Sequence, residues 1–65
     1  MHIQVNGETR TVAATTILGL VEELGLDARK VAVERNLEIV PRSAYGQTAL
    51  ADGDRIEIVH FIGGG

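Results

Sequence analysis

The sequence contains no cysteine and no tryptophan, and it has one each of proline, methionine, tyrosine and phenylalanine. Without cysteine, no disulfide can stabilise the fold and no thiol chemistry can belong to this chain. The lack of cysteine fits a reducing compartment, so we expect a cytoplasmic location.

Basic residues are also few: six lysines and arginines stand against nine acidic residues, which gives a formal net charge of −3. Nucleic acids and anionic membranes attract basic surfaces, so neither is expected as a partner. No apolar run reaches the length of a membrane span, and residues 1–4 lack the basic region of a signal peptide.

With 65 residues, the chain predicts one small domain. A domain near this size buries only about 60% of its unfolded surface, so each large apolar residue matters. Hydrophobic residues make up 45% of the sequence, which argues against disorder.

The beginning of the chain predicts a β-hairpin. Apolar and polar residues alternate over residues 1–5, as in a half-buried strand. Asn6 and Gly7 follow, and both tolerate the positive φ of a type I′ turn. Residues 8–12 then form the returning strand.

One amphipathic helix follows. Its apolar stripe has the spacing i, i+3, i+4 and i+7 and consists of Ile17, Leu20, Val21 and Leu24. Thr15 or Thr16 caps the start through its side-chain oxygen, and Gly25 stands where a helix-ending glycine is expected. Gly19 lies inside the helix at a cost to stability, and we attribute it to close approach of the helix to a sheet.

The second half of the chain predicts further strands. Residues 31–35 alternate, residues 37–40 form a short strand that Pro41 ends, and Asp52–Asp54 is a plain turn into a long apolar last strand. One helix on one face of a mixed sheet of four to five strands is an α+β design. The order matches the β-grasp, or ubiquitin-like, fold, in which the first and last strands pair in parallel at the centre of the sheet.

The last strand runs directly into three glycines. Glycine has no side chain to pack and loses the most entropy on folding, so we expect a domain over residues 1–62 and a flexible tail over 63–65. One interpretation is a frayed terminus. The favoured one is a thread that enters a narrow tunnel in a partner and presents the carboxylate of Gly65, with Gly64 behind it. This carboxylate is an anion at neutral pH and needs activation before it can react.

Apolar residues near the tail predict a docking patch. If Ile56 and Ile58 face the helix, Val59 and Phe61 lie on the open face of the sheet beside the tail. Together with Ile62 and Gly63 they are the predicted partner-binding residues. The alternative is that isolated apolar residues simply remain exposed, as they do on many small proteins.

Other sites are poorly supported. His2 and His60 are the only soft metal-ligand candidates, and without a spacing motif we expect no metal site. No phosphate loop and no catalytic constellation is recognisable, so we expect no enzyme activity of the chain itself.

Several segments together resemble the ThiS sulfur carriers of thiamine biosynthesis, over essentially the whole length. These segments are the opening strand with Asn6-Gly7, Asn36 with the sequence Ile39-Val40-Pro41-Arg42, the stretch Asp52-Gly53-Asp54-Arg55-Ile56-Glu57-Ile58, and the end His60-Phe61-Ile62-Gly63-Gly64-Gly65. Gly63 is an additional glycine where many relatives have another residue, and it lengthens the tether.

The resemblance implies a chemistry for the tail. A ThiF-like adenylyltransferase would use ATP to adenylate Gly65, and sulfur from cysteine, delivered by a desulfurase, would convert it to a thiocarboxylate. A ThiG-like thiazole synthase would then receive the sulfur. No cofactor is expected to bind the chain itself, which would be a monomer when free.

Two other functions remain open at this point. The first is a sulfur carrier for another pathway, such as a molybdopterin-type carrier. The second is a ubiquitin-like tag or an interaction module. Lys30 is the only lysine, which makes chains of the protein on itself improbable.

Overall fold

The computed structural model describes residues 1–61, so predictions for Ile62, Gly63, Gly64 and Gly65 lie outside the described residues. The described part contains five strands, one α-helix and two short 3₁₀ helices. In chain order they are β1 (His2–Val5), β2 (Glu8–Thr11), α1 (Ile17–Glu23), η1 (Ala28–Lys30), β3 (Val31–Arg35), β4 (Glu38–Val40), η2 (Arg42–Ala44) and β5 (Arg55–His60).

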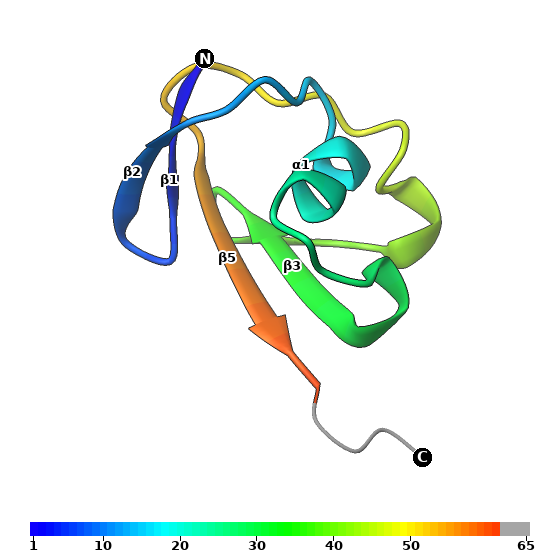
Figure 1. Ribbon diagram of the computed structural model, residues 1–65. Helices are drawn as coiled ribbons and strands as arrows, with labels where there is room; N and C mark the ends of the chain where they lie inside the picture. The colour runs from blue at the N-terminus through cyan, green and yellow to red at the C-terminus, as the bar shows by residue number, and fades with distance from the viewer. Residues whose placement is uncertain (62–65) are drawn as a thin grey trace.

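The five strands form one mixed sheet with the order β2-β1-β5-β3-β4. The central pair, β1 and β5, is parallel and lies side by side in Figure 1, and the other three pairs are antiparallel. Gln4 pairs with Arg55 and Val5 with Ile56. The expected parallel pairing of the first and last strands is therefore confirmed, as is the α+β class.

Two-residue turns close both hairpins. Asn6 and Gly7, with φ of 51° and 85°, join β1 to β2 as the sequence predicts. Asn36 and Leu37, with φ of 52° and 71°, make the corresponding turn between β3 and β4. The same left-handed backbone is thus built once with a glycine and once with a leucine.

Helix α1 begins and ends as its sequence predicts. The Thr16 side chain accepts a hydrogen bond from the Gly19 N–H at 3.1 Å, which satisfies a donor of the first turn. Gly25 has φ of 76°, and the N–H of Leu26 donates to the carbonyl of Val21, as in a Schellman ending. The reason we gave for Gly19 is wrong. A Cβ there would lie 3.3 Å from the Ala14 Cβ and from the Thr16 Oγ1, so the crowding comes from the chain before the helix.

The core lies between α1 and one face of the sheet. Fully buried residues of the sheet meet those of the helix there, and the largest are Ile3, Ile17, Leu20, Ile56, Val21, Val31 and Val33. Tyr45 joins this core, and its hydroxyl donates to the carbonyl of Val31 at 3.0 Å. The opposite face of the sheet carries no helix (Figure 1), so among residues 1–61 it stays accessible.

The Asp52–Asp54 turn is more than the plain turn we expected. Asp54 is 6% exposed, and its carboxylate accepts hydrogen bonds from Arg35 Nε at 2.8 Å, Asn36 Nδ2 at 3.0 Å and the Ala51 N–H at 2.8 Å. Asn36 in turn accepts from the Arg55 N–H at 2.9 Å. These bonds join the start of β5 to the turn that follows β3.

Candidate functional site

The end of β5 brings two large apolar side chains to the open face of the sheet. Val59 is 61% exposed and Phe61 is 46% exposed, whereas Ile56 is fully buried and Ile58 is half-buried beneath the helix side. Ile56 and Ile58 pack on the helix side as expected, and Val59 pairs with the exposed Ala32 on the other side of the sheet, whereas Phe61 follows the last residue of β5. The other predicted site residues, Ile62, Gly63, Gly64 and Gly65, follow outside the described residues.

Strand β5 is held on the β3 side up to its end and on the β1 side as far as Ile58. On the β3 side, pairing continues from Ile56 to His60, and the Phe61 N–H donates to the Lys30 carbonyl at 2.7 Å. On the β1 side, β1 ends at Val5, and the side chain of Asn6 takes the place of a further strand residue. Its Oδ1 accepts from the Ile58 N–H at 2.8 Å and its Nδ2 donates to the Ile58 carbonyl at 3.2 Å. The glycine run of the sequence therefore begins next to a fixed strand end.

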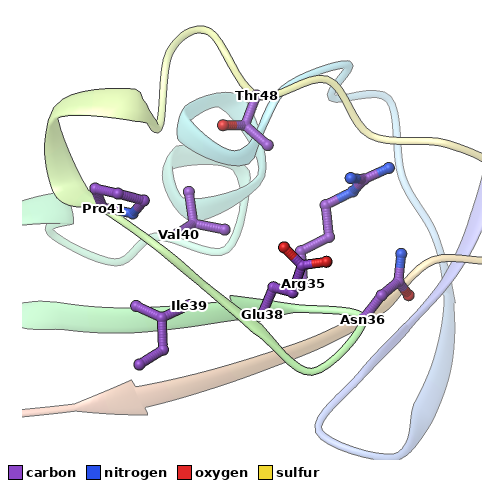
Figure 2. A pocket seen from close by; sticks show the side chains of 7 residues that line it. All are labelled: Arg35, Asn36, Glu38, Ile39, Val40, Pro41 and Thr48. Carbon is purple, nitrogen blue, oxygen red and sulfur yellow. The ribbon is translucent and has the colours of Figure 1, made fainter.

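Further exposed apolar residues lie on strand β4 and its turn, and the sequence reasoning did not select them. Ile39 is 77% exposed and Leu37 is 76% exposed. Figure 2 shows Ile39 and Val40 pointing to opposite sides of β4, with Val40 toward α1. A signal was present: Ile39 and Val40 are adjacent in a strand, so only one of them can face the core.

A surface pocket of about 230 Å³ opens beside β4 on the helix side. Its lining residues, shown in Figure 2, are Arg35, Asn36, Glu38, Ile39, Val40, Pro41 and Thr48. Three of the polar side chains of this lining have partners in the fold: Arg35 and Asn36 bond Asp54, and the Thr48 hydroxyl donates to the Ala44 carbonyl at 2.8 Å. Arg35 and Asn36 thus connect this pocket to the structural network around Asp54.

The two histidines lie at opposite ends of neighbouring strands. The His2 carbonyl accepts from the Gly53 N–H at 2.7 Å, before β5 starts, whereas His60 pairs with Val31 at the end of β5. The His2 ring bonds the Thr11 hydroxyl at 2.9 Å. Within residues 1–61, no three His, Cys, Asp or Glu side chains are grouped as metal ligands. The same residues include no helix with the length and apolarity of a membrane span.

Two carboxyl groups have shifted pKa values. Burial raises the pKa of Asp54, but hydrogen bonds from Asn36, Arg35 and Ala51 outweigh this effect and hold it below its ordinary value. Hydrogen bonds from the side chain and backbone of Arg29 lower the pKa of the half-buried Asp27 to about 2. Asp54 stabilises the turn before β5 and Asp27 caps η1, so both groups are structural.

Comparison with known proteins identifies the family. Residues 3–65 match the family model described as the ThiS family. The sulfur carrier protein ThiS of Bacillus subtilis is 48% identical over 50 residues, which are 77% of this chain and 76% of that protein. The crystal structure of the thiamine biosynthesis protein ThiS from Geobacter metallireducens superposes with a TM-score of 0.84 at 36% identity, over the whole of both chains. This likeness confirms the predicted β-grasp fold.

Longer proteins contain a similar segment. Thiazole synthases of Paramagnetospirillum magneticum and Magnetococcus marinus are 61% and 52% identical to this chain over 66 residues, and the chain spans 20% of the length of each. The match covers 100% of this chain in both cases. The family model, the relatives and the solved structure agree with one another, and the chain belongs to the ThiS family.

Proposed function

We propose that this chain is a sulfur carrier of thiamine biosynthesis and that the carboxylate of Gly65 is the group that carries the sulfur. The observation that carries the proposal is the position of the glycine run. In the sequence the run begins two residues after Phe61, whose N–H is still hydrogen-bonded, and the exposed Val59 and Phe61 precede it, in a chain of the ThiS family. The proposed division is a folded domain over residues 1–62 and a flexible tail over residues 63–65.

The proposed chemistry has three steps on the tail. A ThiF-like adenylyltransferase joins the Gly65 carboxylate to the AMP part of ATP, and pyrophosphate leaves. A cysteine desulfurase takes sulfur from cysteine as an enzyme-bound persulfide, whose terminal sulfur then displaces AMP and forms an acyl disulfide with Gly65. A thiol reductant cleaves the S–S bond and is oxidised to a disulfide, which leaves the thiocarboxylate on Gly65. ATP is bound by the activating enzyme, so the chain itself needs no cofactor, and it acts as a co-substrate rather than as a catalyst.

Docking residues complete the proposal. Val59 and Phe61 are exposed beside the tail and offer apolar contacts to a partner. Ile62 and Gly63 follow Phe61 in the sequence and would enter the partner with the last two glycines. Because glycine has no Cβ, Gly64 and Gly65 fit a tunnel too narrow for other residues.

The proposed acceptor of the sulfur is a thiazole synthase. Support comes from the relatives named thiazole synthase, in which a segment similar to this chain is part of a longer protein. Delivery by a tethered thiocarboxylate keeps the sulfur from diffusing away. We place the reaction in the cytoplasm, with the free carrier as a monomer.

Intact mass spectrometry tests the proposal. The protein is incubated with ATP, a ThiF-like enzyme, a cysteine desulfurase and excess cysteine, whose thiol also serves as the reductant. We expect a gain in mass equal to the replacement of one oxygen by sulfur, which fragmentation assigns to Gly65. No gain, with an activating enzyme that modifies a known carrier under the same conditions, would refute the carrier function and favour a tag or interaction module.

A deletion separates tail chemistry from folding. Removal of Gly64 and Gly65 should abolish the mass gain and leave the melting temperature nearly unchanged, because the core consists of residues that precede the tail. If the deletion unfolds the protein instead, the tail is structural and the proposal is wrong.

A further inference from the structure

The turn between β3 and β4 keeps a leucine in a backbone conformation that favours glycine. Leu37 has φ of 71°, in the left-handed region where a Cβ is crowded by the backbone. In the hairpin between β1 and β2, the equivalent position is Gly7. Leu37 is 76% exposed, so packing within residues 1–61 does little to offset this cost. Residues held in such conformations often have a functional role.

A second unfavourable feature lies beside this turn. Strand register places Ile39 opposite Glu34 and Glu34 opposite Glu57, in one row across three strands on the open face of the sheet. Like charges directly opposite each other destabilise a sheet. The ion pairs found within residues 1–61 join Arg29 to Asp27 and Arg35 to Asp54, and neither involves these two glutamates.

Ile39 links the two features, because it follows Leu37 by two residues and lies opposite Glu34. Arg55 lines a hollow with Leu37 and borders this surface at the start of β5. We call Leu37, Ile39, Glu34 and Glu57 the β4-side surface. It adjoins the residues next to the tail, because Val59 pairs with Ala32 on the same open face, one row from Glu57 and Glu34. A partner that contacts Val59 can therefore also contact the neighbouring β4-side surface.

Building on the proposed function, we propose that the β4-side surface binds the ATP-dependent activating enzyme, which takes Leu37 and Ile39 into an apolar pocket and places a basic side chain between Glu34 and Glu57. An enzyme that binds ATP together with the carboxylate of the tail needs positive charge around that site. An acidic face beside the tail is attracted to such a region. The bound partner then offsets both unfavourable features, since it buries the leucine and neutralises the carboxylates.

A second copy of this chain fits the surface poorly. An interface between two β4-side surfaces would bring the carboxylates of both copies together, and the chain has a net charge of −3. Like-charge contact across an interface opposes association. Charge therefore favours a different, basic partner.

The test measures ATP–pyrophosphate exchange by the activating enzyme against the concentration of carrier, together with the melting temperature of each carrier variant. Leu37→Ala and Leu37→Gly should each raise KM about five- to tenfold, as loss of an apolar anchor does, with kcat unchanged. Only Leu37→Gly should also melt at a higher temperature than the parent, because glycine adopts the positive φ of this turn without steric cost. This opposite movement of stability and binding distinguishes an anchor from a structural residue.

Charge is tested with a matched pair of variants. Glu34→Gln and Glu57→Gln should raise KM and weaken its dependence on salt, without lowering the melting temperature. Glu8→Gln makes the same change on the exposed edge strand β2, at the other side of the sheet, and should leave KM at the parental value.

The outcomes separate this inference from the proposed function. The activating enzyme is first shown to catalyse exchange with a known carrier protein. If it catalyses no exchange with the parent of this chain, both the proposed function and the proposed partner are refuted. If the parent is active but Leu37→Gly keeps the parental KM, or Glu34→Gln and Glu57→Gln behave like Glu8→Gln, only the inference about the β4-side surface is overturned. A concentration-dependent dimer in sedimentation that Leu37→Ala abolishes would also overturn it, since the occupant would then be a second copy.

Discussion

Replacement of Asp54 by asparagine tests the network that positions the start of β5. One carboxylate oxygen accepts from Arg35 Nε and the Ala51 N–H, and the other accepts from Asn36 Nδ2. Asparagine has one acceptor oxygen. If it keeps the bonds to Arg35 and Ala51, its NH₂ group faces the NH₂ group of Asn36. Rotation of the Asn36 amide does not resolve this conflict, because its oxygen accepts from the Arg55 N–H.

The expected loss follows from these contacts. A hydrogen bond to a charged group contributes about 1.5–3 kcal/mol, and an unpaired buried polar group costs about 1–3 kcal/mol. The Arg35 side chain is one-third exposed, so water weakens its part of the network. We therefore expect Asp54→Asn to lower the free energy of unfolding by about 2–3 kcal/mol. At about 4–8 °C per kcal/mol for a domain of this size, the melting temperature should fall by roughly 10–20 °C.

The effect should depend on pH with a defined sign. The pKa of Asp54 is lowered in the folded state, so its contribution is fully present above the pKa of an unfolded aspartate, about 3.9. That contribution is lost as pH falls through the lower folded pKa. The difference in stability between the parent and Asp54→Asn should accordingly be largest near neutral pH and shrink at pH values below about 4.

Thermal and urea melts followed by circular dichroism, at neutral and acidic pH, measure both effects. Asp52→Asn is the matched control. The Asp52 carboxylate is exposed and accepts one bond from the His2 N–H at 2.7 Å, which an asparagine oxygen can also accept. A melting temperature of Asp54→Asn within about 3 °C of that of the parent would refute this account of the network. A decrease in melting temperature no larger than that of Asp52→Asn would refute it as well.

Three further changes test other parts of the structure. Asn6→Ala removes both side-chain bonds to Ile58, so we expect a loss of about 2 kcal/mol in urea melts and faster hydrogen exchange of the Ile58 amide; unchanged exchange would contradict the role given to Asn6. Tyr45→Phe keeps the ring but leaves the Val31 carbonyl without its donor, and should cost about 1 kcal/mol, or about 4–8 °C in melting temperature. Phe61→Ser changes a half-exposed residue, so stability should shift by no more than about 0.5 kcal/mol while KM for the activating enzyme rises about five- to tenfold; an unaltered KM would remove Phe61 from the docking patch.

Local signals allowed much of the fold to be predicted. The Asn6-Gly7 turn, the Thr16 cap and the Gly25 ending depend on bonds between residues close in sequence, so their residue types suffice to indicate them. The alternation expected in β5 placed Val59 on the open face for the same reason, and its pairing with Ala32 agrees. Each of these predictions needed only the period of a strand or the geometry of one turn.

Long-range contacts limited the rest. Asp54 looked like an ordinary turn residue because its partners Asn36 and Arg35 lie 18 and 19 residues earlier in the chain. The reason given for Gly19 was wrong because the atoms nearest to a Cβ at this position belong to Ala14 and Thr16, in the segment before the helix. The apolar pattern of the helix does not indicate where that segment runs. The pair Glu34 and Glu57 becomes visible only when the register of β3 against β5 is known.

The parallel pairing of β1 and β5 has a mechanical consequence. A partner that draws the chain forward from Phe61 pulls along the axis of β5, nearly at right angles to the hydrogen bonds that join it to β3 and β1. Such a load shears these bonds together instead of opening them one after another. The strand should therefore withstand traction that would unzip a hairpin pulled at its open end, and a tunnel can grip the glycine run without unravelling the sheet.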